Sequence, residues 1–141
     1  AIYHQMDDDD LERILSWPPS LVGSDGLPRD RRPHPRLWGA FPRVLGLYAR
    51  EQALLPMAGA IAKMTGQTAD VLDLPDRGRI AEGAFADLVL FDPETIRDAA
   101  SFEDPVRPSI GVRAVYVNGR RAYDGETNEG SACGRLLARS A

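Results

Sequence analysis

The chain has 141 residues, of which 43% are hydrophobic and 27% charged, and its formal net charge is −4. A single ordinary domain has about 100–150 residues, so this length and composition indicate a folded globular chain and argue against disorder. The negative charge argues against a nucleic-acid partner, and no apolar run approaches the ~18–20 residues that span a bilayer.

The first expected element is a helix that begins in a run of four aspartates, residues 7–10. Behind them Leu11, Ile14 and Leu15 share one helical face, and carboxylates in a first turn complement the helix dipole and cap free N–H groups. A calcium site is the alternative, but calcium loops alternate their ligands and contain a glycine, which this run does not. The helix should end before Pro18, because a proline disfavours helical geometry in the residue before it.

Residues 20–26 predict a short buried strand that opens into a basic, proline-rich loop over 27–36. From Phe41 onward we expect a helix with an apolar stripe, which Pro56 breaks while starting the next helix. That second helix should bury the face around Ala60 and end at Gly66, and a short helical turn should follow over 68–72.

After Pro75 the pattern predicts strands rather than helices. Residues 88–91 are a continuous apolar run, as expected of a strand that is covered on both faces. Two further strands, 112–117 and 120–123, flank Asn118-Gly119, a pair that accommodates the two positive φ angles of a type I′ hairpin turn. We therefore expect two parts, residues 1–75 with strand–helix units and residues 76–141 with a small β region and a tail.

Asp25 is the best catalytic candidate by position alone, because it follows the expected strand and stands between Ser24 and Gly26. Glycine lets the backbone approach a ligand closely, and barrel enzymes build their active sites at the carboxyl ends of their strands. Ser-Asp-Gly is also ordinary turn chemistry, so position by itself leaves both interpretations open.

Several segments together resemble the end of the N-acyl-D-amino-acid deacylases (D-aminoacylases), a family within the metal-dependent amidohydrolase superfamily. The resemblance extends over nearly the whole chain. Its most specific part consists of residues 22–26 followed by residues 34–45. The segments are 2–6 (IYHQM), 22–26 (VGSDG), 34–45 (HPRLWGAFPRVL), 63–66 (KMTG), 76–80 (DRGRI), Gly83, 85–93 (FADLVLFDP), 102–105 (FEDP) and 117–119 (VNG).

The resemblance implies an α/β fold: a (β/α)₈ barrel of the TIM type with a small β-sandwich. Residues 1–75 would be the C-terminal part of that barrel, and 76–141 the C-terminal portion of the sandwich with a tail. Asp25 would end the eighth barrel strand, act as general base toward a zinc-activated water and then as general acid toward the leaving amine. It could also contact a second metal position. A carboxylate beside Zn²⁺ suits this role, because bound water has a pKa of about 7.

The chain contains few zinc ligands, since a zinc site needs about four His, Cys or carboxylate groups close together. His4, His34, Cys133 and Asp25 are available, without a His-x-His pair or a plausible ligand spacing. In the family the remaining ligands come from earlier barrel strands, so we expect them upstream of this chain. His4, His34 and Cys133 do not match those ligand positions.

The basic stretch from Arg29 to Arg36 has two interpretations. Arg36, or Arg29, Arg31 or Arg32, could hold the carboxylate of a substrate, since a guanidinium pairs with a carboxylate in bidentate geometry. His34 could line the same pocket. The alternative for each residue singly is a solvated loop, although the stretch as a whole should border the mouth of the active site.

The lone cysteine, Cys133, excludes an internal disulfide and favours a reducing compartment, so we expect a cytoplasmic protein. The N-terminal residues are not typical of a signal peptide. Because the first residue is Ala1 rather than Met, we expect a processed chain or a piece of a longer one.

The resulting hypothesis is the C-terminal part of a zinc-dependent hydrolase that cleaves the amide bond of N-acyl-D-amino acids. Its partners would be that small-molecule substrate and the remainder of the barrel, without nucleic acid or membrane, and the segment alone should be inactive. Two alternatives remain: another amidohydrolase, similar to dihydroorotase or hydantoinase, or a truncated non-catalytic homologue that serves as a binding or assembly module.

Overall fold

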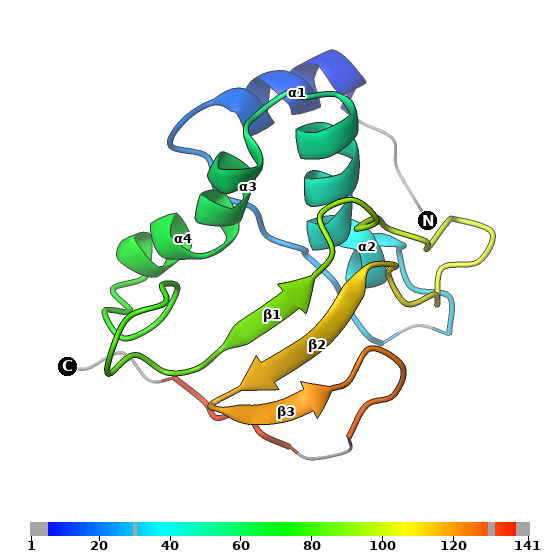
Figure 1. Cartoon of the computed structure of the whole chain (residues 1–141). Helices are drawn as coiled ribbons and strands as arrows, with labels where there is room; N and C mark the ends of the chain where they lie inside the picture. The colour runs from blue at the N-terminus through cyan, green and yellow to red at the C-terminus, as the bar shows by residue number, and fades with distance from the viewer. Residues whose placement is uncertain (1–5, 30, 130–131, 138–141) are drawn as a thin grey trace.

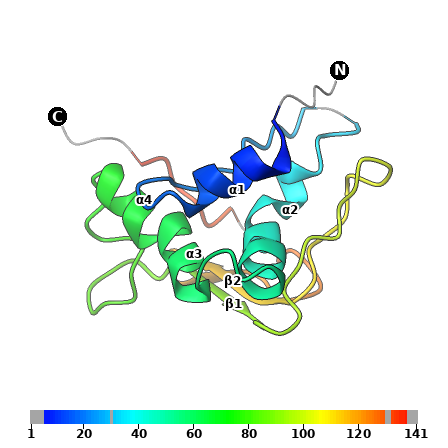
Figure 2. The same ribbon diagram turned by 90° about the horizontal axis from the view of Figure 1, so that it is seen from above.

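The computed structural model describes residues 6–29, 31–129 and 132–137, with helices on one side and a small sheet on the other (Figures 1 and 2). In chain order the elements are α1 (Asp8–Ser16), α2 (Arg36–Arg43), the π-helix η1 (Val44–Glu51), α3 (Met57–Met64), α4 (Gly66–Val71), β1 (Leu88–Phe91), β2 (Val112–Val117) and β3 (Arg120–Tyr123).

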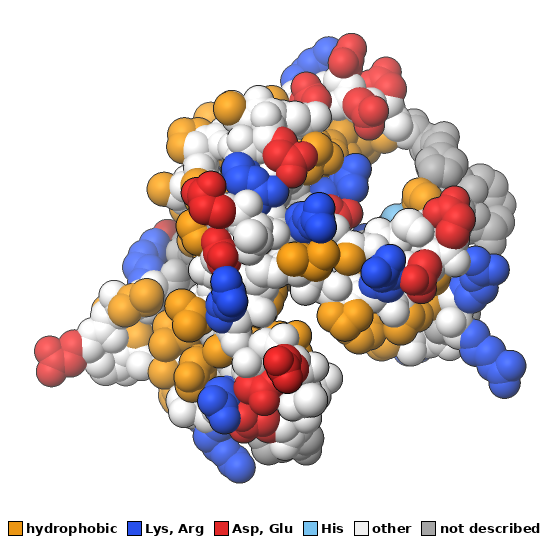
Figure 3. All heavy atoms as spheres, turned by 45° about the vertical axis from the view of Figure 1, so that its right-hand side comes forward, with side chains coloured by type: hydrophobic (Ala, Val, Ile, Leu, Met, Phe, Trp, Pro, Cys, Tyr) orange, Lys and Arg blue, Asp and Glu red, His pale blue; other side chains and the backbone are white. Residues whose placement is uncertain are grey.

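The predicted acidic start of α1 is confirmed. The Asp7 carboxylate accepts a hydrogen bond from the Asp10 backbone N–H at 2.8 Å, and α1 ends at Ser16, before Pro18. Leu15 packs against the core, while Ile14 is 52% exposed. The acidic side chains of this helix gather at the top of Figure 3.

The prediction of a strand over residues 20–26 is wrong for this chain. The segment is extended but belongs to no sheet. One backbone hydrogen bond joins it to α3, from the Val22 N–H to the Lys63 carbonyl at 3.4 Å. A parallel strand takes its hydrogen bonds from neighbouring strands on both sides, and the described residues supply none beside this segment.

The helix predicted from Phe41 begins five residues earlier, at Arg36, and runs through α2 into η1. Pro35 has helical dihedral angles and needs no N–H at the helix start. Pro42 lies inside α2, where it has no N–H for the Trp38 carbonyl four residues before it. The hydroxyl of Ser109 donates to that carbonyl instead, at 2.7 Å. A residue far along the chain therefore satisfies the group that Pro42 leaves unpaired.

The core lies between η1, α3 and the segment that follows β1. Its most deeply buried large side chain is Ile96, 1% exposed, and its other members are Val44, Leu45, Ala49, Leu55 and Ala60. A Cβ at Gly46 would stand 2.5 Å from the Ile96 carbonyl oxygen, so glycine is what lets η1 approach this segment. The core thus joins residues from both sides of the predicted boundary at 75/76.

The predicted face of α3 is confirmed, with Ala60 fully buried. The predicted short turn is confirmed as α4, which begins two residues earlier than expected. Gly66 therefore starts α4 rather than ending the preceding helix, which stops at Met64.

The sheet has the strand order β1–β2–β3, and both pairs are antiparallel. The predicted hairpin is confirmed: Asn118 and Gly119 have φ angles of 50° and 78°. The expectation that residues 88–91 are covered on both faces is wrong for this chain, since Val89 and Leu90 are 57% and 60% exposed. No described element packs over these side chains deeply enough to bury them. Among the described residues, no helix is long and apolar enough to cross a membrane.

A loop of residues 98–109 projects from between β1 and β2, in yellow at the right of Figure 1. It is closed at its base by two backbone hydrogen bonds between Arg97 and Ile110, of 3.1 and 3.0 Å. This loop reaches the start of α2 and so forms one wall of the site described next.

Candidate active site

Asp25 lies at the end of the extended segment that leads away from Lys63, and its side chain is 74% exposed. Its φ angle is +46°, in the left-handed region that few residues other than glycine adopt. Aspartate and asparagine tolerate this region better than other residues do. Ala53, Asp73 and Asn118 have positive φ angles as well, so the conformation alone does not mark a site.

Arg36 holds Asp25 at two points from the first turn of α2. Its Nε donates to the Asp25 carbonyl oxygen at 2.9 Å, and its Nη2 lies 2.7 Å from the carboxylate Oδ2. A guanidinium has five N–H donors, so these two contacts leave donors on Nη1 for another anion.

His34 supports the backbone from which Arg36 projects. Its Nδ1 accepts a hydrogen bond from the Arg36 N–H at 3.1 Å. Because Nδ1 is the acceptor, a neutral imidazole here carries its proton on Nε2. The structure thus brings together Asp25, Arg36 and His34, which the sequence had singled out separately.

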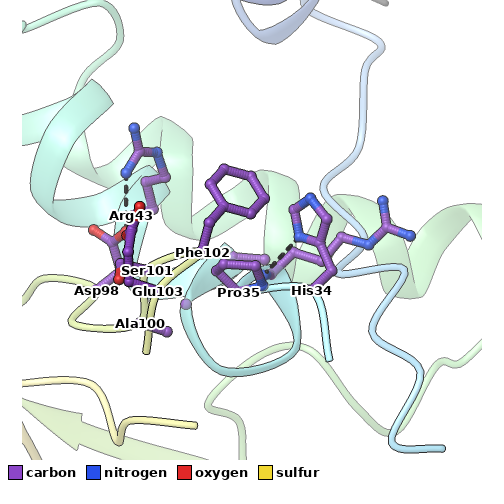
Figure 4. Close-up of a pocket in the computed structure, with 11 residues that line it drawn as sticks. His34, Pro35, Arg43, Asp98, Ala100, Ser101, Phe102 and Glu103 are labelled. Atoms are coloured by element: carbon purple, nitrogen blue, oxygen red, sulfur yellow. Dashed lines mark hydrogen bonds and ion pairs between the residues drawn. The ribbon is translucent and has the colours of Figure 1, made fainter. Parts of the chain in front are cut away.

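A cavity of about 420 Å³ opens beside His34 and Arg36, between the start of α2 and the 98–109 loop (Figure 4), and Asp25 is not among the residues that line it. His34, Pro35 and Arg36 line it from one side, and Asp98, Phe102 and Glu103 from the other. Gly39 allows this close approach, because a Cβ there would stand 2.8 Å from the Asp98 Cβ.

Three side-chain contacts join the two walls. Arg43 Nη1 pairs with Asp98 Oδ2 at 2.9 Å, and Arg32 Nη2 donates to the Glu103 carbonyl at 2.9 Å. The Phe102 ring meets the His34 ring edge to face, with centroids 5.1 Å apart and an interplanar angle of 83°. The Glu103 backbone N–H and the Ser101 hydroxyl lower the pKa of the Glu103 carboxyl.

Asp98, Phe102 and Glu103 were not predicted from the sequence to have a functional role. Phe102 and Glu103 lay within a segment that carried the family resemblance, and this was the only available signal. Their proximity to Arg36 depends on the pairing of Arg97 with Ile110, which directs the 98–109 loop toward α2.

The remaining candidate ligands do not assemble into a metal site. Among the residues that the structure describes, no group of three or more His, Cys, Asp or Glu side chains could hold an ion. Cys133 lies beside the sheet, where its carbonyl accepts from Asn118 Nδ2 at 2.7 Å. His4 falls outside the described residues. The described residues therefore do not form a zinc site by themselves.

Comparison with known proteins identifies the family to which the chain belongs. The sequence profile of the amidohydrolase family matches residues 11–123, and the chain belongs to this family. Over 141 residues it is 52% identical to D-aminoacylase and 48% identical to N-acyl-D-glutamate deacylase, both from Alcaligenes xylosoxydans xylosoxydans. The resemblance to the N-acyl-D-amino-acid deacylases is thereby confirmed.

Solved structures agree with the sequence relatives. A crystal structure of D-aminoacylase covers 97% of the chain with a TM-score of 0.94 and 50% identity. N-acyl-D-glutamate deacylase from Bordetella bronchiseptica, complexed with zinc and a phosphonate mimic of the tetrahedral intermediate, covers 85% with a TM-score of 0.82 and 47% identity. The chain spans 29% of the length of the two Alcaligenes proteins and 29% and 26% of these two structures.

Proposed function

We propose that this chain is the C-terminal part of a zinc-dependent amidohydrolase that hydrolyses N-acyl-D-amino acids to a carboxylate and a D-amino acid. The observation that carries the proposal is the contact of Arg36, beside the cavity, with both the carboxylate and the backbone carbonyl of Asp25. It places a proton-transfer group next to a cation that suits the carboxylate of an amino acid. The identity of about half the residues to D-aminoacylase over the whole chain supports the same activity.

The proposal includes a (β/α)₈ barrel, of which residues 1–75 form the last part, and a sandwich that contains residues 76–141. An extended segment, a loop and the long helix α2–η1 follow one another, which is the order of a barrel unit. Leu88 and Leu90 share one face of β1 and are 37% and 60% exposed, in keeping with a second sheet packed on that face. The cytoplasmic location remains a prediction from the single cysteine.

Asp25 would move the proton that the hydrolysis requires. Its carboxylate accepts a proton from the water whose oxygen attacks the amide carbon, and returns it to the amine nitrogen as the C–N bond breaks. In the longer protein a zinc ion held by residues outside this chain would make that water more acidic. Asp25 is exposed at the end of its segment, so its carboxylate can reach a substrate.

Arg36 would bind the α-carboxylate of the substrate through the donors on Nη1, while Nε and Nη2 keep Asp25 in place. A planar guanidinium can hold two carboxylates on different edges, which the point charge of a lysine cannot do as well. His34 would border the same pocket and orient Arg36.

The test is the Asp25→Asn variant of the longer protein, assayed on N-acyl-D-amino acids. Asparagine keeps the size of the side chain and tolerates a positive φ angle, so the variant should fold. The rate should fall by about 10²-fold or more, the scale on which general acid–base catalysis contributes. The matched control is Asp73→Asn, since Asp73 also has a positive φ angle, +55°, but lies outside the site.

Near-normal turnover of Asp25→Asn would contradict the assignment of Asp25. A panel of N-acyl-D-amino acids, their L-enantiomers and cyclic amides decides the substrate class, and preference for the cyclic amides would contradict the deacylase activity. A zinc measurement on the 141-residue chain itself completes the test, because stoichiometric zinc together with hydrolysis would show that the ligands are not missing.

A further inference from the structure

The 98–109 loop is tied to α2 and to the residues before it at three points. The Ser109 hydroxyl donates to the Trp38 carbonyl, Asp98 pairs with Arg43, and the Glu103 carbonyl accepts from Arg32. Its own base is fixed by the Arg97–Ile110 hydrogen bonds. The loop therefore supports the segment that carries Arg36, although it comes from the sheet region of the chain.

Phe102 is the loop residue that faces this segment most directly. Its ring packs edge to face against His34 (Figure 4). His34 in turn accepts the N–H of Arg36, and Arg36 holds Asp25. These contacts form a continuous path from Phe102 to the candidate catalytic carboxylate.

We propose that Phe102 is a positioning residue for Arg36, acting through His34, and that it thereby sets recognition of the substrate's α-carboxylate. This inference rests on the proposed function. In this role Phe102 acts through His34 rather than by contact with the reacting atoms.

The physical reason lies in the orientation of the His34 ring. Only a ring turned so that Nδ1 faces the Arg36 N–H can accept its hydrogen bond, and the Phe102 ring packs against that orientation. The first N–H groups of a helix have no partner within the helix, so without this acceptor the first turn of α2 is weakened. Arg36 projects from that turn, and its guanidinium would then be held less firmly.

The experiment compares Phe102→Ala with the unmodified longer protein on an N-acyl-D-amino acid and on the matching carboxamide, which has no negative charge. The carboxamide is measured both as a substrate and as a competitive inhibitor, so its affinity is obtained even where its turnover is slow. The preference for the free acid should fall about threefold to tenfold, the equivalent of one aromatic pair. Phe102 is 44% exposed, so its truncation should leave folding intact.

The matched control is Val106→Ala, on the same loop but outside the cavity lining; Val106 is 50% exposed, and its loss should leave the preference unchanged. A second variant, His34→Asn, removes the ring but keeps an acceptor, because an asparagine oxygen can accept the N–H two residues later. In this background Phe102→Ala should have no further effect on the preference.

Equal losses on the free acid and the carboxamide would overturn the inference, because Phe102 would then act only on general stability. An unchanged preference would overturn it as well, and so would a Phe102→Ala effect that persists beside His34→Asn. Failure of the unmodified protein to hydrolyse any N-acyl-D-amino acid would instead contradict the proposed function, so the two failures are distinguishable.

Discussion

Lys63 is the charged residue that fixes the segment leading to Asp25. It is only 6% exposed, and its Nζ donates to the carbonyls of Trp17, Pro18 and Ser20 and to the Ser20 hydroxyl, at 2.6–3.2 Å. Burial lowers the pKa of this ammonium, but four oxygen atoms compensate for the lost hydration. One side chain on α3 therefore joins the end of α1 to the start of the extended segment.

The first residue-scale prediction concerns the shape of this cation. Lys63→Arg keeps the charge, but a planar guanidinium is larger than an ammonium and cannot direct its donors at three converging carbonyls. We expect a loss of stability of about 2–4 kcal/mol, from overpacking and unsatisfied carbonyls. The measurement is thermal unfolding of the longer protein, followed by circular dichroism.

The control for this change is the reverse substitution at an exposed site. Arg13 has a side chain that is 77% exposed and pairs with Asp10, so Arg13→Lys should alter the stability by no more than about 0.5 kcal/mol. If Lys63→Arg were equally harmless, the carbonyl cluster would not require an ammonium.

At the scale of elements, the close approach of η1 to the segment after β1 depends on Gly46. Gly46→Ala would place a Cβ 2.5 Å from the Ile96 carbonyl oxygen, and backbone atoms cannot easily yield. We expect this substitution to destabilise the protein by about 1–3 kcal/mol. Thermal unfolding measures the change.

Gly59→Ala is the matched control and should have the opposite sign. It lies within α3, and the nearest atom to its added Cβ would be Pro56 Cδ at 3.8 Å, an ordinary contact. Alanine favours a helix over glycine by up to about 1 kcal/mol, so this variant should be slightly more stable. Destabilisation of both variants alike would refute the steric explanation for Gly46.

The elements that could be predicted from the sequence are those with local signals. The aspartates of α1, the apolar face of α3 and the Asn118-Gly119 turn each determine their structure within a few residues. The start of α2 was predicted five residues too late, because Pro42 is normally a helix breaker and Ser109, which satisfies the carbonyl it leaves unpaired, is distant in the sequence.

The candidate site likewise has a part that could be predicted from the sequence and a part that could not. The position of Asp25 after an apolar run could be found from the sequence, and Arg36 and His34 were plausible neighbours. The edge-to-face contact of His34 with Phe102 and the cavity both depend on how the 98–109 loop is folded. No local pattern carries that information.

At the scale of the whole molecule, the sheet is incomplete in two respects. Within the described part of the chain, β1 and β3 are both edge strands, and β1 exposes Val89 and Leu90. Leu136, in the tail, is 94% exposed. Unpaired strand edges with apolar side chains favour association with other chains.

We therefore predict that the 141-residue chain on its own aggregates or remains partly unfolded, and that co-expression with the rest of the proposed barrel keeps it in solution. Size-exclusion chromatography and thermal unfolding measure this directly. A monomer with one cooperative unfolding transition would contradict the prediction.

The cluster around Lys63 has a further consequence, for the accessibility of the chain to chemical reagents. Arginine supplies 16 of its 17 basic side chains, so Lys63 is the only lysine. Apart from the N-terminal amine, the sole primary amine of the chain is thus enclosed by backbone carbonyls. An amine-directed reagent reaches it only when α3 separates from the segment that leads to Asp25, and acylation of this lysine therefore reports the opening of that junction.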